Sequence, residues 1–336
     1  MKRGCLLLVL TVFLLSSCGA RPREPEQIAL VSAVGFDGVG DRIRLTVELP
    51  TLGEDAAGTA KLLTGEGNSA SAALVRLTDG APKELVFSHC ALMVLGEDLT
   101  RGQLEDVFAF AGQGTHIPQE AQAVCASNAY GLLSSNENAA TALGYEIPAV
   151  LEQVSRGMGM ELHCAVYRLY ATADPDGAVV LPYFGVAEES SGQAAAFEGL
   201  RILRAGGSAI AVDAEEAALL AWLSERGTDR SLILSNGLEV KEAAAALSAA
   251  KREGRWTLSC HLTAALPRSL SEEDRRALEG ELGRCAEALL VRLTEMGLPL
   301  IGERLAREAP DVWAAFSREG LAAEIHVICT LKGEDT

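Results

Sequence analysis

Strand pairs joined by short turns constrain the fold of this chain more than any other feature of its sequence. Residues 42–50, RIRLTVELP, alternate strictly between apolar and polar side chains, which is typical of a β-strand with one buried face. The apolar segment 28–36 precedes them across the turn DGVGD, so the two segments predict a hairpin. Strand–turn–strand patterns recur over 160–184 and 198–212. Hairpins mixed irregularly with helices favour α+β domains with mixed or mainly antiparallel sheets over a doubly wound parallel fold.

The remaining segments fill in this α+β pattern. Further strands are predicted at residues 84–97, 120–127, 255–266 and 321–333. Helices are predicted at residues 69–80, 101–112, 137–157 and 213–227, the last from the capping pair Asp213 and Glu216. Residues 51–68 are rich in glycine and threonine, and we expect them to be mobile.

The longest helix is predicted over 271–297. Its apolar stripe comprises Leu278, Leu282, Cys285, Leu289, Leu293 and Met296. We expect this stripe to pack on the protein's own sheet, because most amphipathic helices bury their apolar face within their own domain. A seam for a partner helix is the alternative.

The segment 187–196, AEESSGQAAA, is small and polar, so we predict that it links two domains. The N-terminal domain would span 28–186, either as one unit or as two sub-lobes. The C-terminal domain would span 197–333.

The first residues predict export and lipid attachment. Lys2 and Arg3 precede an apolar run that ends at Leu15, which is too short for the ~20 residues that span a bilayer. Residues 1–17 are therefore a predicted signal peptide. Leu15-Ser16-Ser17-Cys18 fits a bacterial lipobox, which makes Cys18 the predicted site of a diacylglyceryl anchor. A plain signal peptide with a chance cysteine is the alternative. Residues 18–27 form a polar tether with two prolines.

The net charge of the chain limits its binding partners, and its cysteines decide whether disulfide bridges can form. A formal net charge of −17 repels nucleic acid and anionic headgroups, so we expect no nucleic-acid binding, and the lipid has to hold the protein at the membrane. Six cysteines follow Cys18, at positions 90, 125, 164, 260, 285 and 329. We favour buried, reduced thiols, because a chain of this length does not need cross-links. Three disulfide bridges remain the alternative, since an exported protein can form them.

Motifs that carry catalysis are not found in the sequence. The five histidines, at positions 89, 116, 163, 261 and 326, lack metal-ligand spacing, and we expect them to be structural. The segment 65–70, GEGNSA, matches part of a dinucleotide fingerprint, but we interpret it as a turn followed by a helix cap. We therefore expect no catalytic residue, no metal site and no cofactor other than the lipid on Cys18.

The order of segments resembles a known family. A lipobox is followed by IALVSAVGFDGVGDRIRLTVEL, SASAALVRL, KELVFSHCALMVLGEDLTRGQLEDVFAFA, AVVLPYF and FEGLRILRAGGSAIAVDAEEAALLAWL. The chain closes with AEALLVRLTEMGLPLIGERLAREAPDVWAAF and LAAEIHVICTL. Together these segments resemble the C-subunit lipoproteins of spore germinant receptors, the Ger(x)C family, over about the whole chain after the signal peptide. His89 matches a histidine typical of that family, and we interpret it as structural.

The resemblance implies a non-enzymatic receptor subunit with an α+β fold. The subunit would be lipid-anchored on the outer face of the spore inner membrane. It would act with a multi-pass A subunit and a multi-pass B subunit, and nutrient binding would trigger ion release and germination. Two other classes stay open. A solute-binding lipoprotein of an importer would have two similar α/β lobes around a cleft, and a tethered hydrolase would need a nucleophile–base pair.

Overall fold

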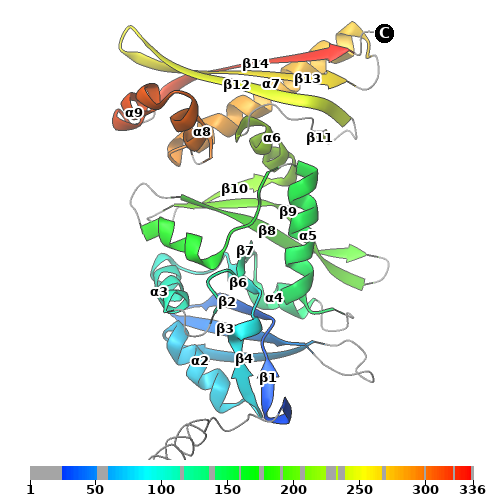
Figure 1. Cartoon of the computed structure of the whole chain (residues 1–336), viewed down its shortest axis with the longest axis vertical. Helices are drawn as coiled ribbons and strands as arrows, with labels where there is room; N and C mark the ends of the chain where they lie inside the picture. The colour runs from blue at the N-terminus through cyan, green and yellow to red at the C-terminus, as the bar shows by residue number, and fades with distance from the viewer. Residues whose placement is uncertain are drawn as a thin grey trace, which may run out of the picture.

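The computed structural model describes most of the chain beyond the predicted signal peptide. The described residues are 25–50, 60–113, 117–135, 141–158, 160–173, 178–189, 192–204, 209–224, 232–233, 239–266, 270–298, 300–320 and 322–333. Cys18 and His116 lie outside them. The described part is elongated, with the N-terminal strands at one end of the long axis and the C-terminal sheet at the other (Figure 1).

One mixed sheet of eight strands occupies the N-terminal two thirds, in the order β10-β9-β8-β7-β6-β2-β3-β4. Its strands are β2 (Ala33–Val39), β3 (Arg42–Leu49), β4 (Lys61–Gly67), β6 (Leu92–Gly96), β7 (Gln122–Ala126), β8 (Ala178–Glu189), β9 (Gly192–Arg204) and β10 (Ala209–Asp213). The central strands β2, β6, β7 and β8 are parallel, and both edges are antiparallel hairpins. The predicted hairpin between residues 28 and 50 is confirmed as β2–β3, and Gly40 supplies the positive φ of 62° in its turn.

Helices cover both faces of this sheet because neighbouring strand residues point to opposite sides. Val34 and Phe36 of β2 pack with α2 (Ala70–Asp79) and α3 (Arg101–Gly112) on one face. Ala33 packs with α4 (Ala129–Ser134) and α5 (Leu143–Met158) on the other. The predicted cap in GEGNSA is confirmed, since the Ser69 side chain accepts a hydrogen bond from the backbone N–H of Ala72 at 3.1 Å.

The C-terminal part is a second sheet backed by helices. Its strands β11 (Leu232–Ile233), β12 (Glu239–Arg252), β13 (Arg255–Leu266) and β14 (Ala323–Gly333) lie in sequence order. The parallel pair β13–β14 is connected through α7 (Glu272–Glu295), α8 (Ile301–Glu308) and α9 (Pro310–Arg318). Helix α6 (Ala214–Ser224) lies between the two sheets, and one continuous apolar core joins them through it (Figure 1).

A small two-stranded parallel sheet lies at the N-terminal end. It pairs β1 (Ile28–Leu30) with β5 (Glu84–Val86). The 3-10 helix η1 (Pro25–Gln27) precedes β1, and η2 (Phe87–His89) follows β5. A third 3-10 helix, η3 (Val166–Ala173), lies before β8.

The α+β class predicted from the sequence is confirmed, as are most helices. The apolar stripe on α7 packs within the protein's own core, where Leu278, Leu282, Leu289 and Leu293 are buried. Cys285 was placed wrongly on this stripe, because it is exposed and the adjacent Ala286 faces inward. The pair Asp213 and Glu216 caps the start of α6 as predicted.

Several boundaries predicted from the sequence are wrong. The expected linker 187–196 is not a free linker, because its residues 187–189 and 192–196 lie in β8 and β9, where Ala187 pairs with Ala194. Small polar residues suit a linker, but they also fit a hairpin whose backbone groups pair with each other. The predicted strand 84–97 is interrupted by η2, and much of the predicted strand 160–172 is η3. Residues 61–67, expected to be mobile, form β4.

Candidate functional site

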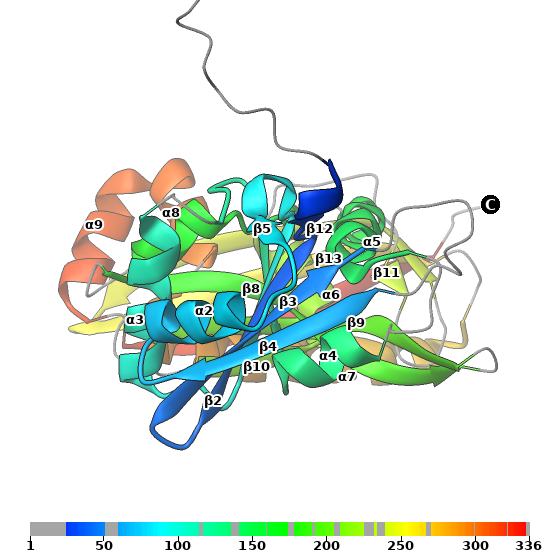
Figure 2. The same ribbon diagram turned by 90° about the horizontal axis from the view of Figure 1, so that it is seen from below.

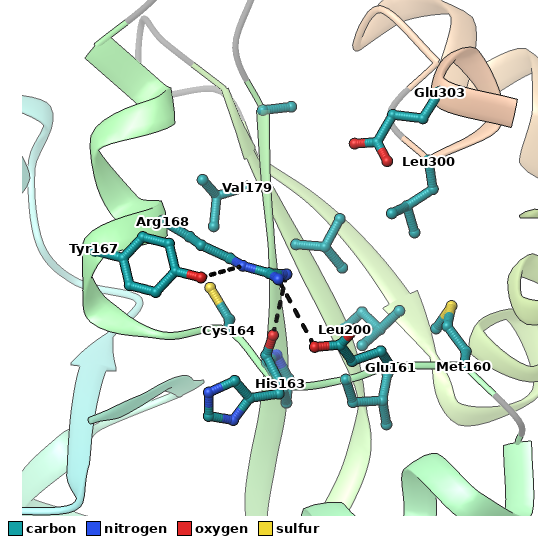
Figure 3. Close-up of a pocket in the computed structure, with 14 residues that line it drawn as sticks. Met160, Glu161, His163, Cys164, Tyr167, Arg168, Val179, Leu200, Leu300 and Glu303 are labelled. Carbon is teal, nitrogen blue, oxygen red and sulfur yellow. Dashed lines mark hydrogen bonds and ion pairs between the residues drawn. The ribbon is translucent and has the colours of Figure 1, made fainter. Parts of the chain in front are cut away.

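A cavity of about 550 Å³ opens where the N-terminal part meets α8 (Figure 3). Four parts of the chain line it: the irregular segment before η3, the helix η3 itself, the strands β8 and β9, and the start of α8. Its lining residues are Met160, Glu161, Leu162, His163, Cys164, Tyr167, Arg168, Ala178, Val179, Val180, Pro182, Leu200, Leu300 and Glu303. The site therefore depends on folding of segments that are more than 100 residues apart.

Arg168 is the central polar group of this cavity. Its Nη1 donates to the carbonyl oxygen of His163 at 3.4 Å, and its Nη2 lies 3.7 Å from Glu161 Oε1. Its Nε donates to Tyr167 Oη at 3.5 Å, and this hydrogen bond raises the pKa of Arg168. Figure 3 shows these contacts converging on the guanidinium. Arg168 is thus held in place and stays cationic.

The opposite wall carries an acidic group and apolar side chains. Glu303 and Leu300 reach the cavity from the start of α8, across from Arg168 (Figure 3). Leu300 has a φ of 64°, a left-handed backbone conformation that non-glycine residues rarely adopt. Val179 and Leu200 add apolar surface to the lining. Such a surface can bind a small molecule that carries both charges, or the side chains of a partner.

The cavity does not offer an activated nucleophile among its described residues. Burial raises the pKa of the Cys164 thiol to about 12, so the thiolate that attacks a substrate is not formed near neutral pH. The neighbouring His163 is exposed. The charged and apolar side chains of the lining can bind a ligand or a partner's side chains.

Two buried carboxylates lie outside the cavity and hold helices. The carboxylate of Asp37 on β2 accepts hydrogen bonds from the backbone N–H groups of Ala129 and Tyr130, at 2.6 and 2.9 Å, at the start of α4. Burial raises the pKa of Asp37, and these two bonds lower it in part. The side-chain oxygens of Asp37 are occupied by a helix N-terminus, where a negative charge is favourable.

Glu48 on β3 does the same for α5. Its Oε1 accepts from the backbone N–H of Leu143 at 2.8 Å, and its Oε2 accepts from the backbone N–H of Gly144 at 2.9 Å. The Ser32 hydroxyl also donates to Oε2 at 2.8 Å. Burial raises the pKa of Glu48. The sequence placed Glu48 and Thr46 on a polar face, but both are fully buried because α4 and α5 cover that face of the sheet.

Arg304 is a buried charge that the sequence does not indicate. Its Nη1 donates to the carbonyl oxygen of Leu223 at 2.8 Å, and its Nη2 donates to the carbonyl oxygen of Ala245. Its Nε pairs with Glu308 at 2.9 Å. These contacts join α6, β12 and α8. Removing one partner from such a buried pair costs about 3–5 kcal/mol.

The structure describes four of the five histidines but does not describe Cys18, the predicted lipid site. Cys18, the predicted lipid site, lies outside the described residues, so its lipidation stays a prediction. Four histidines, His89, His163, His261 and His326, are described, and all four are exposed. His89 lies on the 3-10 turn η2, and the strand residues His261 and His326 contact Thr330 and Glu324 on the solvent face. The expectation that the histidines are structural stays a prediction.

The thiols are mostly buried, as predicted. Burial raises the pKa to about 12 for Cys90, Cys125, Cys164, Cys260 and Cys329. Cys329 is only half-buried, and Cys285 is exposed. All six are free thiols in the structure, while their redox state in the cell stays a prediction.

Metal and membrane signals are not found in the described part of the chain. No three histidine, cysteine, aspartate or glutamate side chains in it gather closely enough to hold a metal ion. None of its helices combines the length and apolar character needed to cross a bilayer.

Comparison with known proteins assigns the N-terminal part of the chain to a family. Residues 21–186 match a family model described as the spore germination protein N-terminal domain. This match supports the Ger(x)C family that the order of segments resembles. The crystal structure of the GerBC protein matches with a TM-score of 0.47 and 14% identity, covering 90% of this chain and 97% of that one. No curated protein matches the sequence.

Proposed function

We propose that this protein is the lipid-anchored C subunit of a spore germinant receptor. The observation that carries the proposal is the match of residues 21–186 to the spore germination protein N-terminal domain. In this proposal, a diacylglyceryl group on Cys18 holds the body at the outer face of the spore inner membrane. Two acyl chains supply about 0.8 kcal/mol per buried CH₂ group, which is enough for stable anchoring.

The proposed role is to couple membrane partners rather than to catalyse a reaction. The partners are a multi-pass A subunit and a multi-pass B subunit. The buried carboxylates described above are used to hold helices, and the cavity around Arg168 suits binding. The alternative of an importer's solute-binding protein predicts two similar lobes. Here an eight-stranded sheet is joined to a four-stranded one, and this difference favours the receptor.

Capture from spore membranes tests the proposal. An affinity-tagged full chain should be found in the membrane fraction and should co-purify with two multi-pass proteins. The matched control is Cys18→Ala, which should take up no labelled fatty acid and should either release the folded body or leave it unprocessed. Recovery of an ATPase and a permease instead would support the importer. An unchanged membrane fraction in the Cys18→Ala strain would contradict the anchor.

A further inference from the structure

A second cavity lies at the end of the molecule where the described chain begins. It has a volume of about 570 Å³, and we call it the basal pocket. It is lined by Glu26, Ile28, Ala29, Leu30, Leu49, Pro50, Lys61, Leu63, Pro82, Lys83 and Leu85. These residues come from η1, β1, β5 and the ends of β3 and β4, which lie at the lower end in Figure 1. Figure 2 shows the molecule from this end, with α2, β3 and β4 in front.

The lining combines apolar side chains with positive charge. Ile28, Leu30, Leu49, Leu63 and Leu85 are each only half-buried, so they present apolar surface to the pocket. Lys61 and Lys83 are exposed at its rim, and within the described residues neither makes an ion pair. Glu26 is the acidic residue of the lining, and the exposed Glu84 lies next to Lys83 in the sequence.

This positive charge is unusual for the chain. The full sequence has a net charge of −17, and its lysines lie at positions 2, 61, 83, 241, 251 and 332. Two of the five lysines beyond the predicted signal peptide therefore line one pocket. An anionic bilayer repels the acidic body as a whole, but the lining of this pocket sets two lysines against the single carboxylate of Glu26, which favours a phosphate locally.

The tether length places this pocket close to the membrane. Cys18 precedes Pro25 by seven residues, and a fully extended chain spans at most about 3.6 Å per residue. A lipid on Cys18 therefore keeps η1 within roughly 25 Å of the bilayer surface. The basal pocket begins at Glu26, directly after this tether.

We propose that the basal pocket binds the headgroup and upper acyl chain of an anionic phospholipid and so orients the body on the bilayer. Lys61 and Lys83 would pair with the phosphate, and the half-buried leucines would contact the chain. This inference rests on the proposed lipid anchor for its membrane setting. The pocket's recognition of the phospholipid itself does not require the anchor.

Lysine protection tests the site directly. The full chain is held in a neutral detergent and pulsed with an amine-reactive reagent, and modification of each lysine is followed by mass spectrometry. Short-chain phosphatidylglycerol, at a concentration that saturates the effect, should slow modification of Lys61 and Lys83 severalfold, because an amine paired with the phosphate is less available to the reagent. The exposed residues Lys241 and Lys332 serve as controls within the molecule and should be unchanged.

Two further probes identify the ligand. Inorganic phosphate and short-chain phosphatidylcholine should protect much less than phosphatidylglycerol. Equal protection by phosphate would mean a simple anion site, and equal protection by phosphatidylcholine would mean that the net negative charge is not recognised. Either result, or no protection at all, would overturn the proposal. The double variant Lys61→Ser/Lys83→Ser should lose phosphatidylglycerol binding, whereas the matched double variant Lys241→Ser/Lys332→Ser should keep it.

The same assay separates this inference from the anchor. Repeated on the Cys18→Ala chain, it should give the same protection, because the lipid is supplied in solution. Suppose that phosphatidylglycerol protects the lysines but the chain with its native Cys18 is not retained at the membrane in cells. Phospholipid binding by the basal pocket would then be supported, and the lipid anchor on Cys18 would be rejected. Membrane retention without lysine protection would support the anchor on Cys18 and reject phospholipid binding by the basal pocket.

Discussion

Asp37 and Glu48 show how single buried carboxylates organise this fold. Asp37 lies on β2 and Glu48 on β3 of the large sheet, and each accepts two backbone N–H groups from the first turn of a helix. Those N–H groups have no partner within their own helix, so a buried helix start needs an acceptor from elsewhere. The carboxylates therefore fix where α4 and α5 sit on the sheet, although burial raises the pKa of both residues.

Substituting Glu48→Gln should destabilise the fold by about 1–3 kcal/mol, because the amide NH₂ group then faces backbone donors that need an acceptor. Chemical denaturation measures this loss. The exposed Glu105→Gln, whose partner Arg101 is one helical turn away, is the control and should change stability by less than about 1 kcal/mol. A loss at Glu48 no larger than that of the control would contradict the capping role.

The pH dependence of this loss follows from the raised pKa of Glu48. Unfolded glutamate ionises near its ordinary pKa of 4.5, while the folded residue ionises at higher pH. Between these two values the folded state holds more protons, so the contribution of Glu48 falls as pH rises. Glutamine does not titrate. The destabilisation by Glu48→Gln should therefore be largest below pH 4.5 and shrink above it, and the opposite trend would contradict the raised pKa.

At the scale of secondary-structure elements, the β8–β9 hairpin decides where the N-terminal domain ends. The family match stops at residue 186, within β8, yet β8 pairs along its length with β9 and meets β7 at a single residue pair. A domain cut at 186 would leave β8 with almost no hydrogen-bonded neighbour. Such exposed strand edges promote aggregation.

A chain of residues 25–186 should therefore fail to unfold cooperatively, and much of it should be insoluble. A chain of residues 25–224, which keeps β9, β10 and α6, should be more soluble and show a cooperative thermal transition. Circular dichroism and sedimentation of the two chains measure the difference. A soluble, cooperatively folded 25–186 chain would restore the domain boundary first expected from the sequence.

The spacing of apolar residues predicted a helix or strand correctly where the residue types of the segment favour that same structure. The predicted helix 271–297 became α7, since its leucines recur at helical spacing and its N-cap Ser271 is present. Strand β12 could not be found in this way, because EVKEAAAALSAAKR consists of strong helix formers. Its pairing with β13 along nearly the whole strand overrides that preference. Tertiary contacts, rather than the local sequence, decide the secondary structure of such segments.

The candidate sites were harder to predict than the elements. Lys61 and Lys83 are 22 residues apart, and they come together only because β1 and β5 pair beside β4. Arg168 and Glu303 face each other through the packing of α8 on the N-terminal part. A lone arginine or a pair of lysines carries no spacing that a sequence pattern could detect. Cys18 is different, because its signal lies entirely in neighbouring residues.

At the scale of the whole molecule, the two ends differ in what they can contact. The basal pocket lies at the end nearest the proposed anchor, and the sheet β11–β14 lies at the far end (Figure 1). A body oriented by its N-terminal end would hold the C-terminal sheet away from the bilayer. The cavity around Arg168 would lie between the two, at the junction of both parts.

The central claim is that the protein acts in nutrient-triggered germination from its lipid anchor, and ion release from spores tests it most directly. Spores lacking the gene should form normally but release ions slowly or not at all when nutrients are added. The native gene should restore release, and the Cys18→Ala gene should not. Normal release from the deletion strain, with no second copy of the receptor present, would contradict the account and would make the importer the leading hypothesis.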